Sequence, residues 1–167
     1  MSAKFYGKYR GMVVANEDPE RRGRISVQVP DVNGLVPQMW AMPCVPFTGI
    51  QSGMWCVPAI GAGVWVEFEQ GDPDMPIWTG GFWSTAGDPP ALAQAALPGL
   101  PNIVLQTVSQ STLVLSDNPA VGIMLKTNTG AMILINEAGI LLSNGKGATI
   151  LMSGPTVTVN AGALVVT

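Results

Sequence analysis

The stretch GIMLKTNTGAMILINEAGILLSNGKGATILMSGPTVTVNAG, residues 122–162, repeats one short pattern along its whole length. A glycine returns at intervals of 8, 9, 8, 7 and 8 residues, at Gly122, Gly130, Gly139, Gly147, Gly154 and Gly162. The runs between the glycines are apolar or β-branched, which favours extended strands, whereas glycine permits the positive φ of a sharp corner. A strand-and-corner array of nearly fixed period is typical of a β-helix or β-prism, which is a rod.

Both faces of these strands are apolar. In one run Met132 and Leu134 share one face, and Ile133 and Ile135 share the other, because side chains alternate along a strand. A single-chain solenoid needs a polar outer face, and this one would have only about three rungs, near the minimum for stability. We therefore predict that several chains wrap together, with a small β-sandwich domain as the alternative.

The composition points to the same kind of burial. The chain has 167 residues, of which 47% are hydrophobic and only 11% are charged, against about 25% charged in an average domain. Residues 102–167 carry four charged side chains: Lys126, Lys146, Asp117 and Glu137. Such a chain is expected to bury surface against other chains. The net charge of −3 argues against a general nucleic-acid binder, whose affinity depends on neutralising phosphates.

Three zones follow from the sequence, at residues 1–84, 85–101 and 102–167. The first holds all five tryptophans and most of the charges. The second is rich in proline, alanine and glycine, and its prolines (Pro89, Pro90, Pro98 and Pro101) allow at most a short turn of helix at 91–97. The third is the repeat.

The first zone is predicted to form a small antiparallel barrel. Residues 23–30 alternate cleanly, with Ile25, Val27 and Val29 on one face, and residues 63–70 do the same. Strands are also expected at 9–16 and 75–83, with a bulge or a close backbone approach at Gly80-Gly81. About five strands in about 80 residues fit a Greek-key barrel of the OB type.

The chemical inventory argues against catalysis and against a bound cofactor or metal. The chain has no histidine and two cysteines, Cys44 and Cys56, which excludes His-based triads and leaves a poor ligand set for zinc. Buried free thiols are the expected state of the cysteines, and a single disulfide is the alternative. Glu67 and Glu69 share a strand face, but a solvated or inter-subunit face explains them better than a glycosidase pair.

Two further groups have a structural and a functional interpretation. Arg21, Arg22 and Arg24 form the one basic cluster of the sequence, and three neighbouring acids largely cancel its charge. We interpret the cluster as a turn rather than a nucleic-acid site. The tryptophans are better explained by core and subunit interface than by base stacking; they are Trp40, Trp55, Trp65, Trp78 and Trp83.

The segments described above resemble a known family. The matching stretches are residues 11–19, 22–30, 40–41, 58–74 and 76–83. Together they are similar to the OB-fold domain of phage baseplate central spikes, including baseplate assembly protein V, of extracellular contractile injection system spikes, and of type VI valine-glycine-repeat proteins. The downstream repeat is similar to the intertwined β-helix of the same proteins.

The resemblance implies an all-β homotrimer with a five-stranded OB-fold collar at 1–84 and an intertwined trimeric β-helix needle at 102–167. It implies a baseplate hub above the collar, a PAAR-type tip protein at the C-terminus and a target membrane that the needle contacts mechanically. The last residues end on open strands, so they are predicted to dock the tip; they are Ala163, Leu164, Val165, Val166 and Thr167.

The chain departs from some spikes of this kind in two ways. A lysozyme domain present in some of them has no counterpart in the short segment 85–101, and without histidine the apical iron site of some phage spikes cannot form. An adaptor that loads cargo is the alternative function. A fibre-like adhesin is a third, although the repeat has no aromatic side chain after Trp83.

Assembly is expected in the bacterial cytoplasm, within a phage tail-like particle or virion baseplate. Residues 1–10 lack the apolar core of a secretory signal. Residues 147–167 are uncharged and long enough to cross a membrane as a helix. Pro155, the interior glycines and the threonines argue against such a helix.

Overall fold

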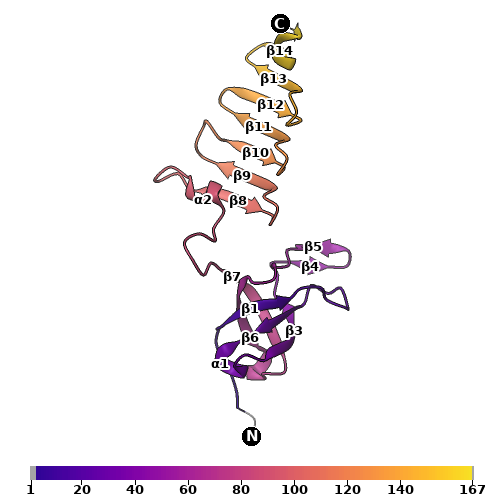
Figure 1. The fold of residues 1–167 in the computed structure, drawn as a ribbon, viewed down its shortest axis with the longest axis vertical. Coiled ribbons are helices and arrows are strands. Elements are labelled where there is room, and N and C mark those ends of the chain that lie inside the picture. The colour runs from indigo at the N-terminus through magenta and orange to yellow at the C-terminus, as the bar shows by residue number, and fades with distance from the viewer. Residues whose placement is uncertain (1–2, 167) are drawn as a thin grey trace. The chain divides into compact units, whose positions relative to one another are not determined.

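The computed structural model describes residues 3–166, apart from the side chains of residues 38, 39, 165 and 166. The chain divides into two compact units, Met1–Asp88 and Pro89–Thr167. Each unit is all-β apart from short helical turns (Figure 1).

The first unit is a closed five-stranded barrel, as predicted. Its strands are β1 (Tyr9–Ala15), β2 (Ile25–Gln28), β3 (Pro37–Pro43), β6 (Gly63–Phe68) and β7 (Pro76–Phe82). They close in the order β1-β2-β3-β7-β6. Neighbouring strands are antiparallel except for β3 and β7, which are parallel. Short elements complete the unit: helix α1 (Pro30–Asn33), hairpin β4 (Thr48–Gly49) and β5 (Ser52–Gly53), and turn η1 (Glu69–Gly71).

The barrel core comes from alternate residues of these strands. Ile25 and Val27 of β2 and Val64 and Val66 of β6 are all 0% exposed, as their alternation predicted. Trp78 of β7 is also buried, and its indole Nε1 donates a hydrogen bond to the carbonyl oxygen of Gly23 at 3.2 Å. Full burial of each such aliphatic side chain contributes about 1.5–3 kcal/mol to folding.

Two local predictions can be compared with the barrel. A bulge is present at the expected place, because two residues of β7, Thr79 and Gly80, lie opposite one residue of β6 between the pairs Val64–Gly81 and Val66–Trp78. The strand expected over 63–70 ends earlier, at Phe68, because Gln70 and Gly71 both have positive φ and turn the chain. Glu69 therefore lies in η1, so the prediction that Glu67 and Glu69 share a strand face is wrong.

The second unit is one eight-stranded antiparallel sheet in which each strand pairs with its neighbour in sequence. Figure 1 shows these strands stacked in order, with the final strand at the end of the stack. The strands are β8 (Asn102–Gln106), β9 (Thr112–Ser116), β10 (Ile123–Lys126), β11 (Met132–Asn136), β12 (Gly139–Ser143), β13 (Thr149–Ser153), β14 (Thr156–Val159) and β15 (Leu164–Val166). Helix α2 (Ala91–Gln94) lies beside β8, where the Asn102 side-chain amide donates to the Leu92 carbonyl at 3.2 Å. Turn η2 (Asn160–Gly162) links β14 to β15.

The turns of this sheet depend on glycine. All six glycines of the repeat have positive φ. The requirement is strictest at Gly139, where φ is 135° and a Cβ atom would lie 1.9 Å from the Met152 carbonyl oxygen. At Gly122 it would lie 2.2 Å from the Ile135 carbonyl oxygen. At these two positions glycine provides both the corner and the close approach of the adjacent strand.

No helix within residues 3–166 has the length and apolar character that a membrane crossing needs.

Candidate subunit interface

Strand register aligns the apolar side chains of the sheet into straight rows. Because cross-strand partners share a face, the pairing joins one residue of every strand into a single row: Leu105, Leu113, Leu125, Ile133, Leu142, Ile150, Val159 and Leu164. A second row lies two residues away on the same face: Ile103, Leu115, Ile123, Ile135, Ile140, Met152 and Val157. We call this side of the sheet the two-row face.

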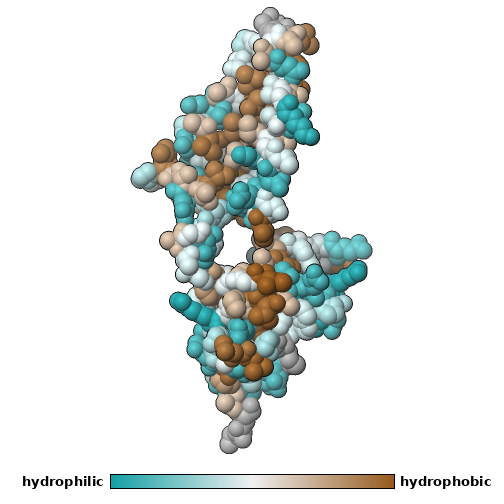
Figure 2. Space-filling model, in the orientation of Figure 1, coloured by the Kyte–Doolittle hydropathy of each residue, from teal (hydrophilic) through white to brown (hydrophobic). Residues whose placement is uncertain are grey.

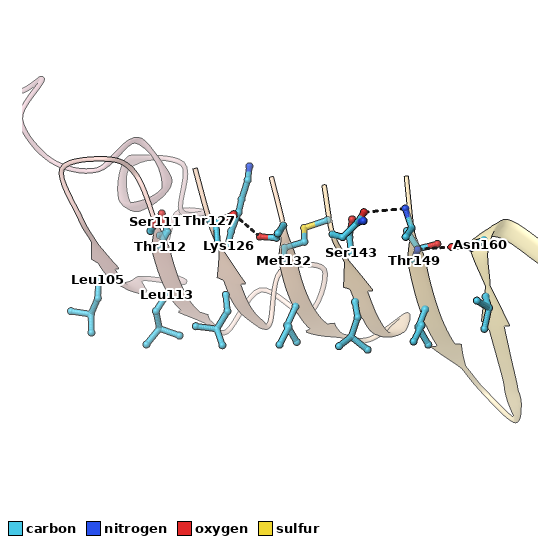
Figure 3. A pocket seen from close by; sticks show the side chains of 18 residues that line it. Leu105, Ser111, Thr112, Leu113, Lys126, Thr127, Met132, Ser143, Thr149 and Asn160 are labelled. Carbon is cyan, nitrogen blue, oxygen red and sulfur yellow. Dashed lines mark hydrogen bonds between the residues drawn. The ribbon is translucent and has the colours of Figure 1, made fainter. Parts of the chain in front are cut away.

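The opposite side, the one-row face, is less apolar. Its central row is Val104, Val114, Met124, Leu134, Leu141, Leu151 and Thr158. Polar residues flank that row at the strand ends, for example Thr112, Lys126 and Ser143. Figure 3 shows Leu105 and Leu113 extending from one side of the sheet and Lys126 from the other.

The two-row face is exposed in the single chain. Ten of its large apolar side chains are between 36% and 63% exposed: Ile103, Leu105, Leu115, Ile123, Leu125, Ile133, Ile135, Ile150, Met152 and Leu164. The one-row face is better covered at its start, where Val114 is 1% and Thr112 is 6% exposed. Figure 2 shows apolar side chains gathered along the sheet of the second unit. A continuous apolar surface of this extent marks a binding interface.

A hollow of about 910 Å³ runs beside the first of the two rows (Figure 3). Its volume is within the range of ligand pockets, but such pockets enclose their ligand and place a few polar groups around it. Here the floor is a ladder of aliphatic side chains from Leu105 to Val159, and the polar groups lie only along one side. A long, shallow, aliphatic surface is suited to another protein chain rather than to a small molecule.

The hairpin loops form two edges of the sheet. Edge A consists of loops 107–111, 127–131, 144–148 and 160–163, and edge B of loops 117–122, 137–138 and 154–155. The first three loops of edge A share one kind of hydrogen bond, in which the amide of the first loop residue donates to the carbonyl of the last loop residue at 2.9–3.1 Å. On edge B the first two loops touch, because the Glu137 amide donates to the Pro119 carbonyl at 3.0 Å. Edge A therefore repeats one loop geometry.

The residues predicted to dock a tip lie at the end of the sheet. β15 pairs with β14 alone and is an end strand among the described residues. Ala163 is exposed and Leu164 is 58% exposed. Thr167 lies outside the described residues.

The basic cluster of the first unit is an ion-paired turn. The Asp18 carboxylate accepts hydrogen bonds from Arg24 Nε at 3.0 Å and Nη2 at 2.7 Å, and from the Arg22 amide at 2.7 Å. Its side chain is only 3% exposed. The Arg24 guanidinium, helped by the backbone amides of Glu20, Arg22 and Arg24, holds the pKa of Asp18 well below its usual range. Arg24 therefore serves to close this turn.

Several single residues differ from their predictions. Cys44 and Cys56 are free, as expected, but both are exposed, so the prediction that they are buried is wrong. They flank the β4–β5 hairpin region, which projects apolar side chains outward rather than packing into the barrel: Ile50 is 98% and Phe47 is 63% exposed. Glu67 pairs with Lys8 at 2.9 Å in an exposed salt bridge.

The five tryptophans divide among three environments. Trp78 lies in the core, and Trp40 and Trp65 are half-buried on the barrel, where the Arg10 guanidinium lies 5.6 Å from the Trp65 ring. Trp55 and Trp83 are 70% and 66% exposed. Core packing therefore explains only one of them fully.

Comparison with family models agrees with both units. Residues 9–83 match the type VI secretion system/phage-baseplate injector OB domain. Residues 102–165 match the phage baseplate V C-terminal trimerisation domain. The chain belongs to the phage baseplate V family. Its two domains give this baseplate V protein a structural role in the baseplate or spike of a phage or type VI secretion machine. No curated protein matches the chain.

The sequence alone did not reveal the difference between the two faces of the baseplate V sheet. Both faces appear apolar within any one run, and the distinction depends on register between strands. A signal was present in the polar residues that begin or end the runs, such as Thr112, Lys126 and Thr149. They share the alternation of the one-row face, which leaves the two-row face uniformly aliphatic.

Proposed function

We propose that this chain is the structural central spike subunit of a contractile injection machine and acts as a homotrimer. The carrying observation is that the exposed two-row face spans the residues matched by a trimerisation domain. Three copies that turn this face toward a common axis would remove its aliphatic rows from water, at about 25 cal/mol for each Å² buried.

The shape of the two-row face supports a needle. The rows cross every strand, and seven inter-strand steps of about 4.8 Å give a stripe roughly 34 Å long, whereas two residues along a strand span only about 7 Å. A long, narrow stripe is buried when three sheets stand around an axis perpendicular to their strands. Edges A and B then form the corners of a triangular prism, and the twist of each sheet winds the three chains about one another.

The remaining parts of the proposal follow from the family and from the open ends of the sheet. The barrel units form a collar below a hub ring, and the end strand β15 accepts a PAAR-type tip protein by strand pairing and apolar contact. The trimer is assembled in the cytoplasm and pierces the target envelope mechanically. The protein carries out no catalysis, because the sequence lacks histidine and a lysozyme domain.

An adaptor function is the second candidate, and the β4–β5 hairpin region favours it. Phe47, Ile50 and Trp55 there are 63%, 98% and 70% exposed. A surface of this kind on the barrel unit would hold cargo without any contribution from the needle.

The native mass of the intact chain tests the trimer. We expect three copies by native mass spectrometry, and we expect Ile150→Glu, on the two-row face of β13, to give monomers with a folded barrel. Ser153→Glu places the same charge at an exposed position of the one-row face of the same strand, and it should leave the trimer intact. A wild-type monomer that is stable and well folded would exclude the proposal.

A further inference from the structure

The four charged residues of the sheet are sorted by sign onto its two edges. Lys126 ends β10 at edge A, and Lys146 lies in the 144–148 loop of the same edge. Asp117 lies in the 117–122 loop of edge B, and Glu137 lies in the 137–138 loop of that edge. Edge A is therefore positive and edge B negative, although the strands between them carry no other charge.

Among residues 3–166, none of these four charges forms an ion pair. All four residues are exposed. The ion pairs found within residues 3–166 all lie in the barrel unit. Each sheet thus presents two exposed cations on edge A and two exposed anions on edge B.

Three-fold closure brings these two sides together. When the two-row faces of three sheets turn toward one axis, edge A of each chain must meet edge B of the next, because the interface is heterologous and closes into a ring. Rotation about the axis keeps the height of every strand. Lys126 then lies between the heights of Asp117 and Glu137 of the neighbouring chain, and Lys146 lies about one strand step, roughly 5 Å, from that Glu137.

We infer that complementary charges at the three corners of the trimer, Lys126 and Lys146 of one copy facing Asp117 and Glu137 of the next, fix the register and direction of chain association. This rests on the proposed homotrimer. The aliphatic rows attract the chains to one another but do little to fix their relative height. A chain shifted along the axis by two strands would again place similar aliphatic side chains in contact. In a closed ring, a chain that slips by two strands is raised against one neighbour and lowered against the other. At one of these two corners Lys146 then lies about three strand steps from Glu137 instead of one, so the charges distinguish the correct height.

Charge reversal on the full-length chain tests the inference. One variant reverses edge A (Lys126→Glu with Lys146→Glu), a second reverses edge B (Asp117→Lys with Glu137→Lys), and a third reverses both. The control, Glu17→Lys with Asp74→Lys, applies the same charge change as the second variant at exposed barrel positions. The measured quantity is the chain concentration at which half the molecules are trimeric, by analytical ultracentrifugation in about 20 mM and about 500 mM NaCl, where the Debye length is roughly 20 Å and 4 Å.

We expect each single-edge variant to raise that concentration at least about ten-fold at low salt, because every corner then holds like charges. The variant with both edges reversed should return to within about three-fold of the wild type, and high salt should reduce all the differences. If a single-edge variant fails to fold, recovery in the third variant still decides the question.

Two results would overturn the inference. One is a both-edge variant that dissociates as readily as a single-edge variant, and the other is single-edge variants that behave like the barrel control. Either would leave the trimer itself standing, whereas a monomeric wild type would remove the proposed function and this inference together.

Discussion

At the scale of single residues, the corners of the sheet tolerate little change. Gly139 and Gly154 both have positive φ, but only Gly139 faces a backbone carbonyl at the position where a Cβ atom would lie. Substituting Gly154 would therefore test the cost of a strained φ alone, whereas substituting Gly139 would add a collision with the adjacent strand.

We predict that Gly139→Ala destabilises the second unit by more than about 3 kcal/mol, since strained φ alone costs about 1–3 kcal/mol and the backbone of β13 must also shift. Gly154→Ala, which meets nothing within 4 Å, should cost only about 1 kcal/mol. Urea unfolding at one fixed chain concentration measures both. Equal losses would show that the close approach at Gly139 carries no cost.

A second residue-scale prediction concerns Asp18 and pH. Its pKa is lowered in the folded barrel, so its contribution to stability is fully present above the unfolded value of about 3.9 and is lost as pH falls through the folded pKa. We expect the barrel melting temperature to fall as the pH drops below about 4. The Asp18→Asn variant should melt at a lower temperature than the wild type at neutral pH, and its melting temperature should depend less on pH in acid. Asp74→Asn, at an exposed turn position, is the control and should retain the acid dependence of the wild type.

At the scale of secondary-structure elements, the strands of the sheet differ in how many neighbours support them. Inner strands such as β11 pair on both sides, whereas β15 pairs only with β14. In a repeating array an end element contributes one interface instead of two. β15, like β8 at the other end of the described sheet, pairs on one side only, and it is the end strand at the C-terminal side of the chain. It is therefore a strand that can be lost at low cost and that has a free edge.

We predict that deletion of residues 160–167 leaves a folded trimer with a modest loss of stability but abolishes capture of a PAAR-type tip protein. A pull-down with the candidate tip, together with a delivery or infectivity assay, measures the two effects. If the shortened chain still binds the tip protein and still supports delivery, the prediction is wrong and the partner surface must lie on the barrel unit.

Elements also show what the sequence could and could not predict. Alternation in β2 and β6 predicted the barrel core, because one face of each strand is buried and the other is not. The sequence did not predict the end of β6, because Gln70 adopts a positive φ and glutamine is not a residue type that indicates such a turn. Cys44 and Cys56 were predicted to be buried from their residue type, but their exposure depends on where a long excursion between β3 and β6 is placed.

At the scale of the whole molecule, the two units have different relations to oligomerisation. The barrel has its own closed core, whereas about half of the large apolar residues described in the sheet are exposed in the single chain. Assembly should therefore depend on the second unit.

We predict that residues 89–167 expressed alone form a trimer, and that residues 1–88 expressed alone are a folded monomer. Limited digestion with elastase, which cleaves after small side chains, should cut the intact trimer first within 85–101, where Ala91, Ala93, Ala95 and Ala96 lie, because cleavage requires local opening. Light scattering and mass spectrometry of the fragments check both statements. Early cleavage within 132–159, or a trimeric barrel fragment, would contradict this division.

The meander of the second unit also has a mechanical consequence. Antiparallel backbone hydrogen bonds lie perpendicular to the strands, so in this sheet they all point along the stack from β8 to β15. A thrust along that direction presses every donor toward its acceptor, and the load is shared by the whole ladder. Tension along the same line instead peels the end strand away and then the next, one pair at a time. By this argument the sheet resists compression far better than extension, which is the property that the proposed piercing role requires.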